Sequence, residues 1–139
     1  MPKIQYLNPP GLGPAQGLYS MCTLVPAGTD TYHVAGQLAV AKDGAIVGVG
    51  DFAAQFHQVF GNLGDLLKVL GETWDSVIVF RTYLVHSQSI PKFMELRKAL
   101  FPKLFSTSTY PPNTLLMIDR LVKEEFVIEL EAVVAKTKT

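Results

Sequence analysis

The chain has 139 residues, with 12 basic and 12 acidic side chains and therefore a formal net charge of zero. Apolar residues make up 48% and charged residues 17%, which is typical of a globular protein and excludes a disordered chain. The balanced charge and the lack of a Lys/Arg-rich run argue against nucleic acid or an acidic membrane surface as the main partner. We expect one domain over residues 1–139, and a homo-oligomer that covers part of the apolar surface.

The cysteine count and the absence of long apolar stretches indicate where in the cell the protein is expected. Cys22 is the single cysteine, so no internal disulfide can form, and we expect a buried structural thiol in a reducing environment. No apolar leader opens the sequence and no stretch is long enough to span a bilayer. A cytoplasmic location is the resulting expectation.

The first half of the chain predicts a loop, a hairpin and a helix. Proline and glycine dominate residues 8–17, which favours a loop. Two β-prone runs, at 18–26 and 31–40, flank a short polar break and predict a hairpin, with a second tight turn at Asp43–Gly44. Apolar residues then recur at helical spacing between an N-cap candidate, Asp51, and a C-terminal glycine, Gly71.

The second half predicts a strand over 75–86, a helix from Pro91 to about Leu104, and strands over 113–120 and 126–135. Two helices are too few to cover both faces of a sheet. The order therefore favours an α+β fold, a mixed sheet with both helices on one face. We expect the other face to be bare, apolar and packed against another subunit.

Arg97 breaks the pattern of the second helix. It lies one turn after Phe93, within the face that Phe93, Leu96 and Leu100 define. A buried arginine needs a carboxylate or several acceptors to offset its desolvation. The alternative is that Arg97 extends from the edge of this face to water and only covers the core.

Glu129 and Glu131 break the pattern of the last strand. Residues alternate between the two faces of a strand, so both carboxylates point the same way from an otherwise apolar row. Like charges beside apolar neighbours raise a pKa and favour a general base. For Glu131 an exposed, solvated carboxylate is the stronger interpretation, whereas for Glu129 the two interpretations stay open.

Other candidate sites are weaker. Gly36, in the middle of a predicted strand, indicates close approach of a backbone or a ligand, and Tyr19 offers a hydroxyl beside a Gly-rich loop. The three histidines are scattered without ligand spacing, so no metal is expected. Phosphate-binding and dinucleotide-binding glycine motifs are missing, so no cofactor is expected.

Taken together, five segments resemble the Rid (YjgF, perchloric-acid-soluble) family. GLYS resembles its G-P-Y-S, VAGQL its S-G-Q-I/L, and FGNLGDLLKVLG its helix ending N-L-x-x-x-L-x-x-x-G. YPPNTLL resembles its P-x-R-S segment and IELEAVVA its V-E-I-E-A-I-A ending. The resemblance implies a chorismate-mutase-like fold and a homotrimer with a pocket at each subunit interface. It also implies hydrolysis of 2-imino or enamine acids to 2-oxo acids and ammonia, without metal or cofactor.

The same resemblance implies the site residues. Glu129 falls on the family's pocket glutamate and is the catalytic candidate, while Arg97, Asn113, Tyr19, Ala35, Gly36 and Thr114 are the candidates for binding a small carboxylate metabolite. The family's anchoring arginine aligns with Asn113, and its pocket asparagine aligns with Arg97. The two residue types have exchanged places, so Arg97 is expected to enter the pocket from the helix side, where it could pair with Glu129 when the pocket is empty.

Three alternatives stand beside deamination. One is a non-catalytic metabolite binder or sensor that uses the same pocket. Another is the RNA cleavage or translation inhibition attached to the family's name, against which the zero net charge argues. The third is chorismate-mutase-like chemistry, which a shared fold does not establish.

Overall fold

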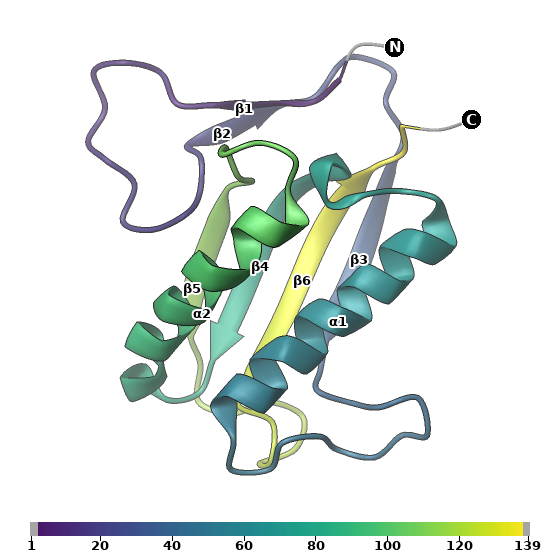
Figure 1. The fold of residues 1–139 in the computed structure, drawn as a ribbon, viewed down its shortest axis with the longest axis vertical. Helices are drawn as coiled ribbons and strands as arrows, with labels where there is room; N and C mark the ends of the chain where they lie inside the picture. The colour runs from purple at the N-terminus through teal and green to yellow at the C-terminus, as the bar shows by residue number, and fades with distance from the viewer. Residues whose placement is uncertain (1–2, 138–139) are drawn as a thin grey trace.

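The computed structural model describes residues 3–137 and contains one four-stranded sheet, one two-stranded sheet and two long helices (Figure 1). The strands are β1 Gln5–Leu7, β2 Cys22–Leu24, β3 Thr31–Gln37, β4 Val77–Leu84, β5 Asn113–Met117 and β6 Ile128–Ala135. The helices are α1 Phe52–Leu70 and α2 Ile90–Leu104, with single 3-10 turns at η1 Trp74–Ser76 and η2 Ser87–Ser89. Within this described part, no helix is both long and apolar enough to cross a membrane.

The larger sheet is mixed, as predicted. Its strand order is β3-β6-β4-β5, with β4 and β5 parallel and the other neighbours antiparallel. Both helices lie on the same face of this sheet (Figure 1). The expected α+β class, with two helices covering one face, is confirmed.

The predicted hairpin is wrong. The short strand β2 pairs with β1, which the sequence did not predict, while β3 pairs with β6 at the far end of the chain. The chain does turn after β2, where Thr29 donates to the carbonyl of Pro26. It then enters the larger sheet beside β6, whose apolar row gives β3 more surface to bury than three residues of β2 could.

Helix α1 forms as its sequence predicts. The carboxylate of Asp51 accepts a hydrogen bond from the N–H of Ala54 at 3.0 Å, and this satisfies one free donor of the first turn. At the other end Gly71 adopts a left-handed conformation, with a φ of 74°, which glycine reaches without steric cost. The turn at Asp43–Gly44 is also present, with the N–H of Ala41 bonded to the carbonyl of Ala45.

The core lies between the helices and the larger sheet. Six phenylalanines form its centre: Phe56, Phe60, Phe80, Phe93, Phe101 and Phe105. Each is at most 5% exposed and contributes on the order of 2 kcal/mol by burial. Phe93 and Phe101 belong to α2, and Arg97 lies between them on the same buried side of this helix.

The strands are shorter than predicted, and one residue is placed differently. Strand β3 ends at Gln37 and β4 spans Val77–Leu84, where 31–40 and 75–86 were expected. Strand β5 ends at Met117 and β6 begins at Ile128, so a longer connection joins them. Cys22 is exposed, not buried, because the two-stranded sheet that holds it lies outside the main core. A short two-stranded sheet outside the core buries few of its side chains.

Candidate functional site

Arg97 is buried within the core layer, at 1% exposure, and is the bulkiest of the fully buried side chains. Its helix buries Phe93, Arg97 and Phe101, one residue every four, so Arg97 occupies the middle of the buried stripe. The expectation that Arg97 lies in the apolar face is confirmed. The alternative, in which its guanidinium reaches out to water, is wrong.

The guanidinium of Arg97 lacks the acceptors that burial demands. Its Nη2 contacts the sulfur of Met94 at 3.0 Å, and sulfur is a weak acceptor. Its Nε and Nη1 have no hydrogen-bond partner within the described chain. Neither of the ion pairs found among residues 3–137 includes Arg97. A buried cation without an anion is a strong sign of a missing partner, since isolated buried charge costs several kcal/mol.

Aromatic rings supply part of the compensation. The guanidinium carbon lies 5.0 Å from the ring centre of Phe93 and 6.0 Å from that of Phe101, within cation–π range. Burial nevertheless lowers the pKa of Arg97 to about 10, while the nearby Tyr19 hydroxyl has the opposite, smaller effect. Arg97 therefore keeps its charge at neutral pH and remains able to bind an anion.

Glu129 lies on the other face of the sheet. In β6 the buried residues Ile128 and Leu130 point toward the helices. Because side chains alternate along a strand, Glu129 and Glu131 point away from the helices. The predicted alternation is confirmed. Both carboxylates are half-buried in this single chain.

A bulge in β3 creates the space for Glu129. Val34 pairs with Ala132 but Gln37 pairs with Leu130, so β3 has one residue more than β6 over this interval. The extra residue brings Gly36 against Glu129, and a side chain built on Gly36 would lie 2.6 Å from the carboxyl carbon. The close approach expected at Gly36 is confirmed, and the group that approaches is a carboxylate.

The electrostatics of this face favour a base. Burial, followed by the negative charge of Glu131, raises the pKa of Glu129 above the ordinary value of 4.5. Tyr83 donates a hydrogen bond to Glu131, and this bond raises the pKa of Tyr83. Glu131 is thus engaged by Tyr83, while Glu129 makes no hydrogen bond or ion pair within the described chain.

The face around Glu129 is uncovered but not apolar, which corrects one prediction. Arg81 pairs with Glu131 across the strands and Tyr83 with Glu129, so charged and polar groups fill the centre of this face. Apolar residues remain beside them, with Val79 opposite Val133. The apolar run at 75–86 predicts a strand buried on both faces. This prediction is wrong for the face that carries Arg81, which is exposed.

The remaining predicted residues divide between the two faces. Asn113 pairs with Phe80, a core residue, and its side-chain oxygen accepts a 2.8 Å hydrogen bond from the buried hydroxyl of Thr82. Thr114 pairs with Arg81 on the exposed face and is itself exposed. Ala35 lies beside Gly36 at the bulge, and Tyr19 lies close to Arg97.

Two half-sites result. The first, which we call the arginine half-site, contains Arg97, Tyr19, Gly17 and Met94 on the helix side. The second, the glutamate half-site, contains Glu129, Gly36 and Ala35 on the exposed face. Arg97 and Glu129 form no ion pair in the described chain, because the sheet lies between them. Gly17 opens the GLYS segment but was not predicted as a site residue, and neither was Met94; contact with Arg97 assigns both to this half-site.

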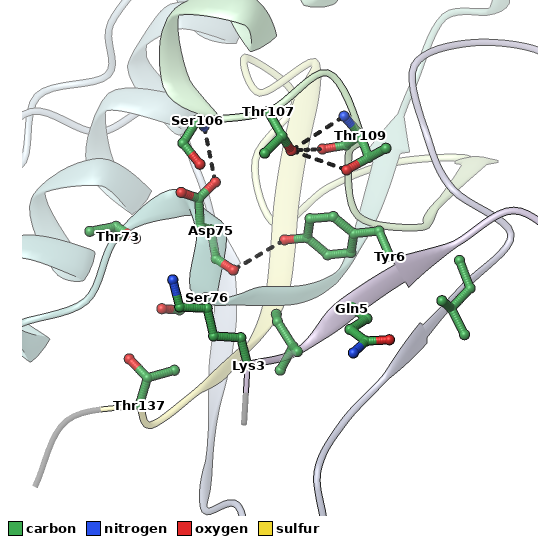
Figure 2. Close-up of a pocket in the computed structure, with 12 residues that line it drawn as sticks. Lys3, Gln5, Tyr6, Thr73, Asp75, Ser76, Ser106, Thr107, Thr109 and Thr137 are labelled. Atoms are coloured by element: carbon green, nitrogen blue, oxygen red, sulfur yellow. Dashed lines mark hydrogen bonds between the residues drawn. The ribbon is translucent and has the colours of Figure 1, made fainter. Parts of the chain in front are cut away.

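A separate cleft of about 580 Å³ contains none of the predicted residues. It lies where β1, η1 and the segment after α2 meet, and Figure 2 shows Tyr6 and Asp75 inside it. Two of its polar side chains are engaged within the chain: Tyr6 donates to the carbonyl of Val77 at 2.6 Å, and Asp75 accepts from the N–H of Ser106 at 3.1 Å. Unlike Arg97, Tyr6 and Asp75 therefore have hydrogen-bond partners of their own.

Metal-binding geometry is also missing from residues 3–137. No three His, Cys, Asp or Glu side chains in this range are grouped closely enough to hold a metal ion.

Fold and half-sites define a small α+β protein with a buried cation on one side of its sheet and a carboxylate on the other. A sequence model described as Endoribonuclease L-PSP matches residues 14–136. The Rid-family protein YyfB from Yersinia pestis is 30% identical, with a TM-score of 0.84 over 96% of this chain and 98% of that one. The chain belongs to the Rid family, to which the L-PSP model corresponds.

More distant structures share the fold. Escherichia coli TdcF, solved with bound serine, is 21% identical, with a TM-score of 0.69 over 94% of each chain. The E. coli YjgF product is 23% identical, with a TM-score of 0.68 over 88% of this chain and 91% of that one. A search of curated protein sequences gave no match.

Proposed function

We propose that this protein binds a small carboxylate metabolite through Arg97 and hydrolyses 2-imino acids to 2-oxo acids and ammonia. One observation carries the proposal: a fully buried guanidinium, with Nε and Nη1 unpartnered, in a chain whose family site is a small-molecule pocket. A carboxylate supplies two acceptors in the plane of the guanidinium, which is the geometry that arginine binds best. Binding would offset the desolvation that Arg97 already carries.

The complete site needs two copies of the chain. Arg97 and Glu129 lie on opposite sides of one sheet, so a ligand held by Arg97 of one copy meets Glu129 only if the latter comes from another copy. The open face that carries Glu129 is the surface a second copy would cover. We propose the homotrimer that the family resemblance implies, with the arginine half-site of one subunit facing the glutamate half-site of the next.

The reaction follows from these groups. The substrate carboxylate binds Arg97, and the carboxylate of Glu129 accepts a proton from a water molecule as the water oxygen bonds to the imine carbon. The proton passes to the imine nitrogen, and a further proton transfer from the new hydroxyl accompanies cleavage of the C–N bond. The products are a 2-oxo acid and ammonia, and no electrons are exchanged. The raised pKa of Glu129 suits this alternation between base and acid.

Two further points support the relocated cation. The family resemblance places Asn113 where the family carries an arginine, and the side-chain oxygen of Asn113 accepts from Thr82, so β5 offers no cation of its own. TdcF was solved with bound serine, whose carboxylate is the kind of group that we assign to Arg97. Both fit a carboxylate held from the helix side of the pocket.

A rate measurement tests the proposal. Ammonia release from freshly generated 2-iminobutanoate would be followed for the wild type, Arg97→Lys and Glu129→Gln, with Glu95→Gln as an exposed control on the same helix. We expect turnover in the wild type and the control and its loss in the other two variants. Turnover that survives both substitutions would overturn the proposal.

A non-catalytic carboxylate binder is the second candidate. It is favoured by the placement of Asn113, because moving the cation to α2 changes how a bound acid is oriented toward Glu129. Saturable, Arg97-dependent binding of 2-oxobutanoate without turnover would select it. We do not propose RNA cleavage, because the chain has no excess positive charge.

A further inference from the structure

Gly17 lies directly against the guanidinium of Arg97. The Cα of Gly17 faces the guanidinium so closely that a methyl group built on it would overlap Nη2 of Arg97 and lie 3.3 Å from the sulfur of Met94. The φ of Gly17 is not positive, so the backbone there suits any residue and glycine is needed only for space. The missing side chain allows this segment to close over the cation.

Gly17 belongs to a loop pinned at its base. Asn8 donates through Nδ2 to the hydroxyl of Ser20 at 3.1 Å and accepts through Oδ1 from the N–H of Met21 at 3.1 Å. Asn8 thus joins the two ends of residues 9–19, which we call the flap. Compact surface loops with adjoining ends are frequently functional.

The flap has few bonds to the body beyond its base. Within the flap, the N–H of Gln16 donates to the hydroxyl of Tyr19 at 3.0 Å and the N–H of Tyr19 donates to the carbonyl of Gly17 at 3.0 Å. The side-chain amide of Gln16 also donates to the carbonyl of Pro14 at 3.3 Å. These bonds hold residues 16–19 as a turn without tying them to α2. Leu18 packs on the core, while most residues from 9 to 16 are exposed. The flap therefore closes over Arg97 mainly by packing.

The closed flap gives the guanidinium of Arg97 fewer hydrogen-bond acceptors than a bound anion would. The carbonyl of Gly17 is engaged by Tyr19, and Nε and Nη1 of Arg97 remain without acceptors beneath the flap. We infer that residues 9–19 gate the arginine half-site, with Gly17 as the residue that sets the balance between a closed flap and a bound carboxylate. The inference deepens the proposed function and rests on it for the identity of the ligand.

The test measures how accessible Arg97 is. Intact protein would be treated with phenylglyoxal, which modifies arginine, and the rate at each arginine followed by peptide mass spectrometry. Arg81 and Arg120, both exposed, serve as internal standards. The variant is Gly17→Ala. The matched control is Gly13→Ala, in the same flap, where an added methyl meets no atom within 4 Å.

We expect Arg97 to react slowly in the wild type and in Gly13→Ala, and roughly tenfold faster in Gly17→Ala. Arg81 and Arg120 should keep their rates in all three proteins. A tenfold change corresponds to about 1.4 kcal/mol in the equilibrium between the closed and the open flap. Equal rates at Arg97 in all three proteins would overturn the gate. Adding 2-oxobutanoate separates the two proposals. Protection of Arg97 supports the anion anchor, whereas acceleration by Gly17→Ala without any protection would leave the gate standing and remove the proposed ligand.

Discussion

The charged groups on the two faces of the larger sheet have opposite surroundings. On the helix side Arg97 is enclosed by aromatic rings and a glycine, with two nitrogens left without acceptors. On the open side Glu129 is half-buried among other charged groups, at a bulge that makes room for it. The first arrangement costs stability and suits binding, since an arriving anion offsets the cost. The second tunes a pKa and suits proton transfer.

The largest expected effect separates these roles at Glu129. Substituting Glu129→Gln removes the proton acceptor but keeps the size and polarity of the side chain, so imine turnover should fall by about 10²–10⁴-fold. Binding of 2-oxobutanoate, which depends on Arg97 in this account, should change little. Steady-state ammonia release and calorimetric titration of the same preparation measure the two. A matching loss of affinity would mean that both half-sites bind the acid.

A methyl group at the bulge should disturb the glutamate half-site. Gly36→Ala would force the Glu129 carboxylate from its position, and we expect turnover to fall by roughly 10–100-fold because small misplacements of a catalytic group are costly. The control is Gly61→Ala on α1, where an added methyl meets no atom within 4 Å. Equal turnover rates in Gly36→Ala and Gly61→Ala would show that the space at Gly36 is not needed to position Glu129.

The pH dependence of turnover sharpens the electrostatic side of the comparison. A base with a raised pKa is active only when deprotonated, so activity should fall as the pH drops through a value above 4.5. Glu131→Gln removes the negative charge that contributes to this rise, and the acid limb should move to lower pH. Rate–pH profiles of the wild type and the variant measure the shift. An acid limb that stays in place would assign the titration to another group.

How much of this was predictable depends on the range of the interactions involved. The pattern of α1 and the alternation of β6 are local, and spacing predicts both correctly. Spacing also places Arg97 on the buried stripe of its helix, but it leaves open whether the guanidinium is buried or reaches water. The pairing of β3 with β6 joins segments about a hundred residues apart, so adjacency along the chain suggested the wrong partner. The contact of Gly17 with Arg97 depends on how the loop packs on α2, and no pattern of residues in the sequence predicts it.

The smallest expected effect concerns Asn113. If the cation has moved to α2, Asn113→Ala should change the affinity for 2-oxobutanoate by no more than a few-fold. The free energy of unfolding should fall by about 1–2 kcal/mol, because the hydroxyl of Thr82, 1% exposed, loses its acceptor. Calorimetric titration and urea unfolding measure the two quantities. A large loss of affinity would return the anchor to β5.

The most direct test of the central claim is the thermal stability of the wild type and Arg97→Met, each with and without saturating 2-oxobutanoate. Methionine fills a similar volume without a charge, so the ligand-free variant should be more stable than the wild type, by about 1–2 kcal/mol. The ligand should raise the melting temperature of the wild type and leave that of the variant unchanged. An Arg97→Met protein that is less stable than the wild type, or one that the acid stabilises equally, would contradict the assignment of Arg97 as an anion anchor.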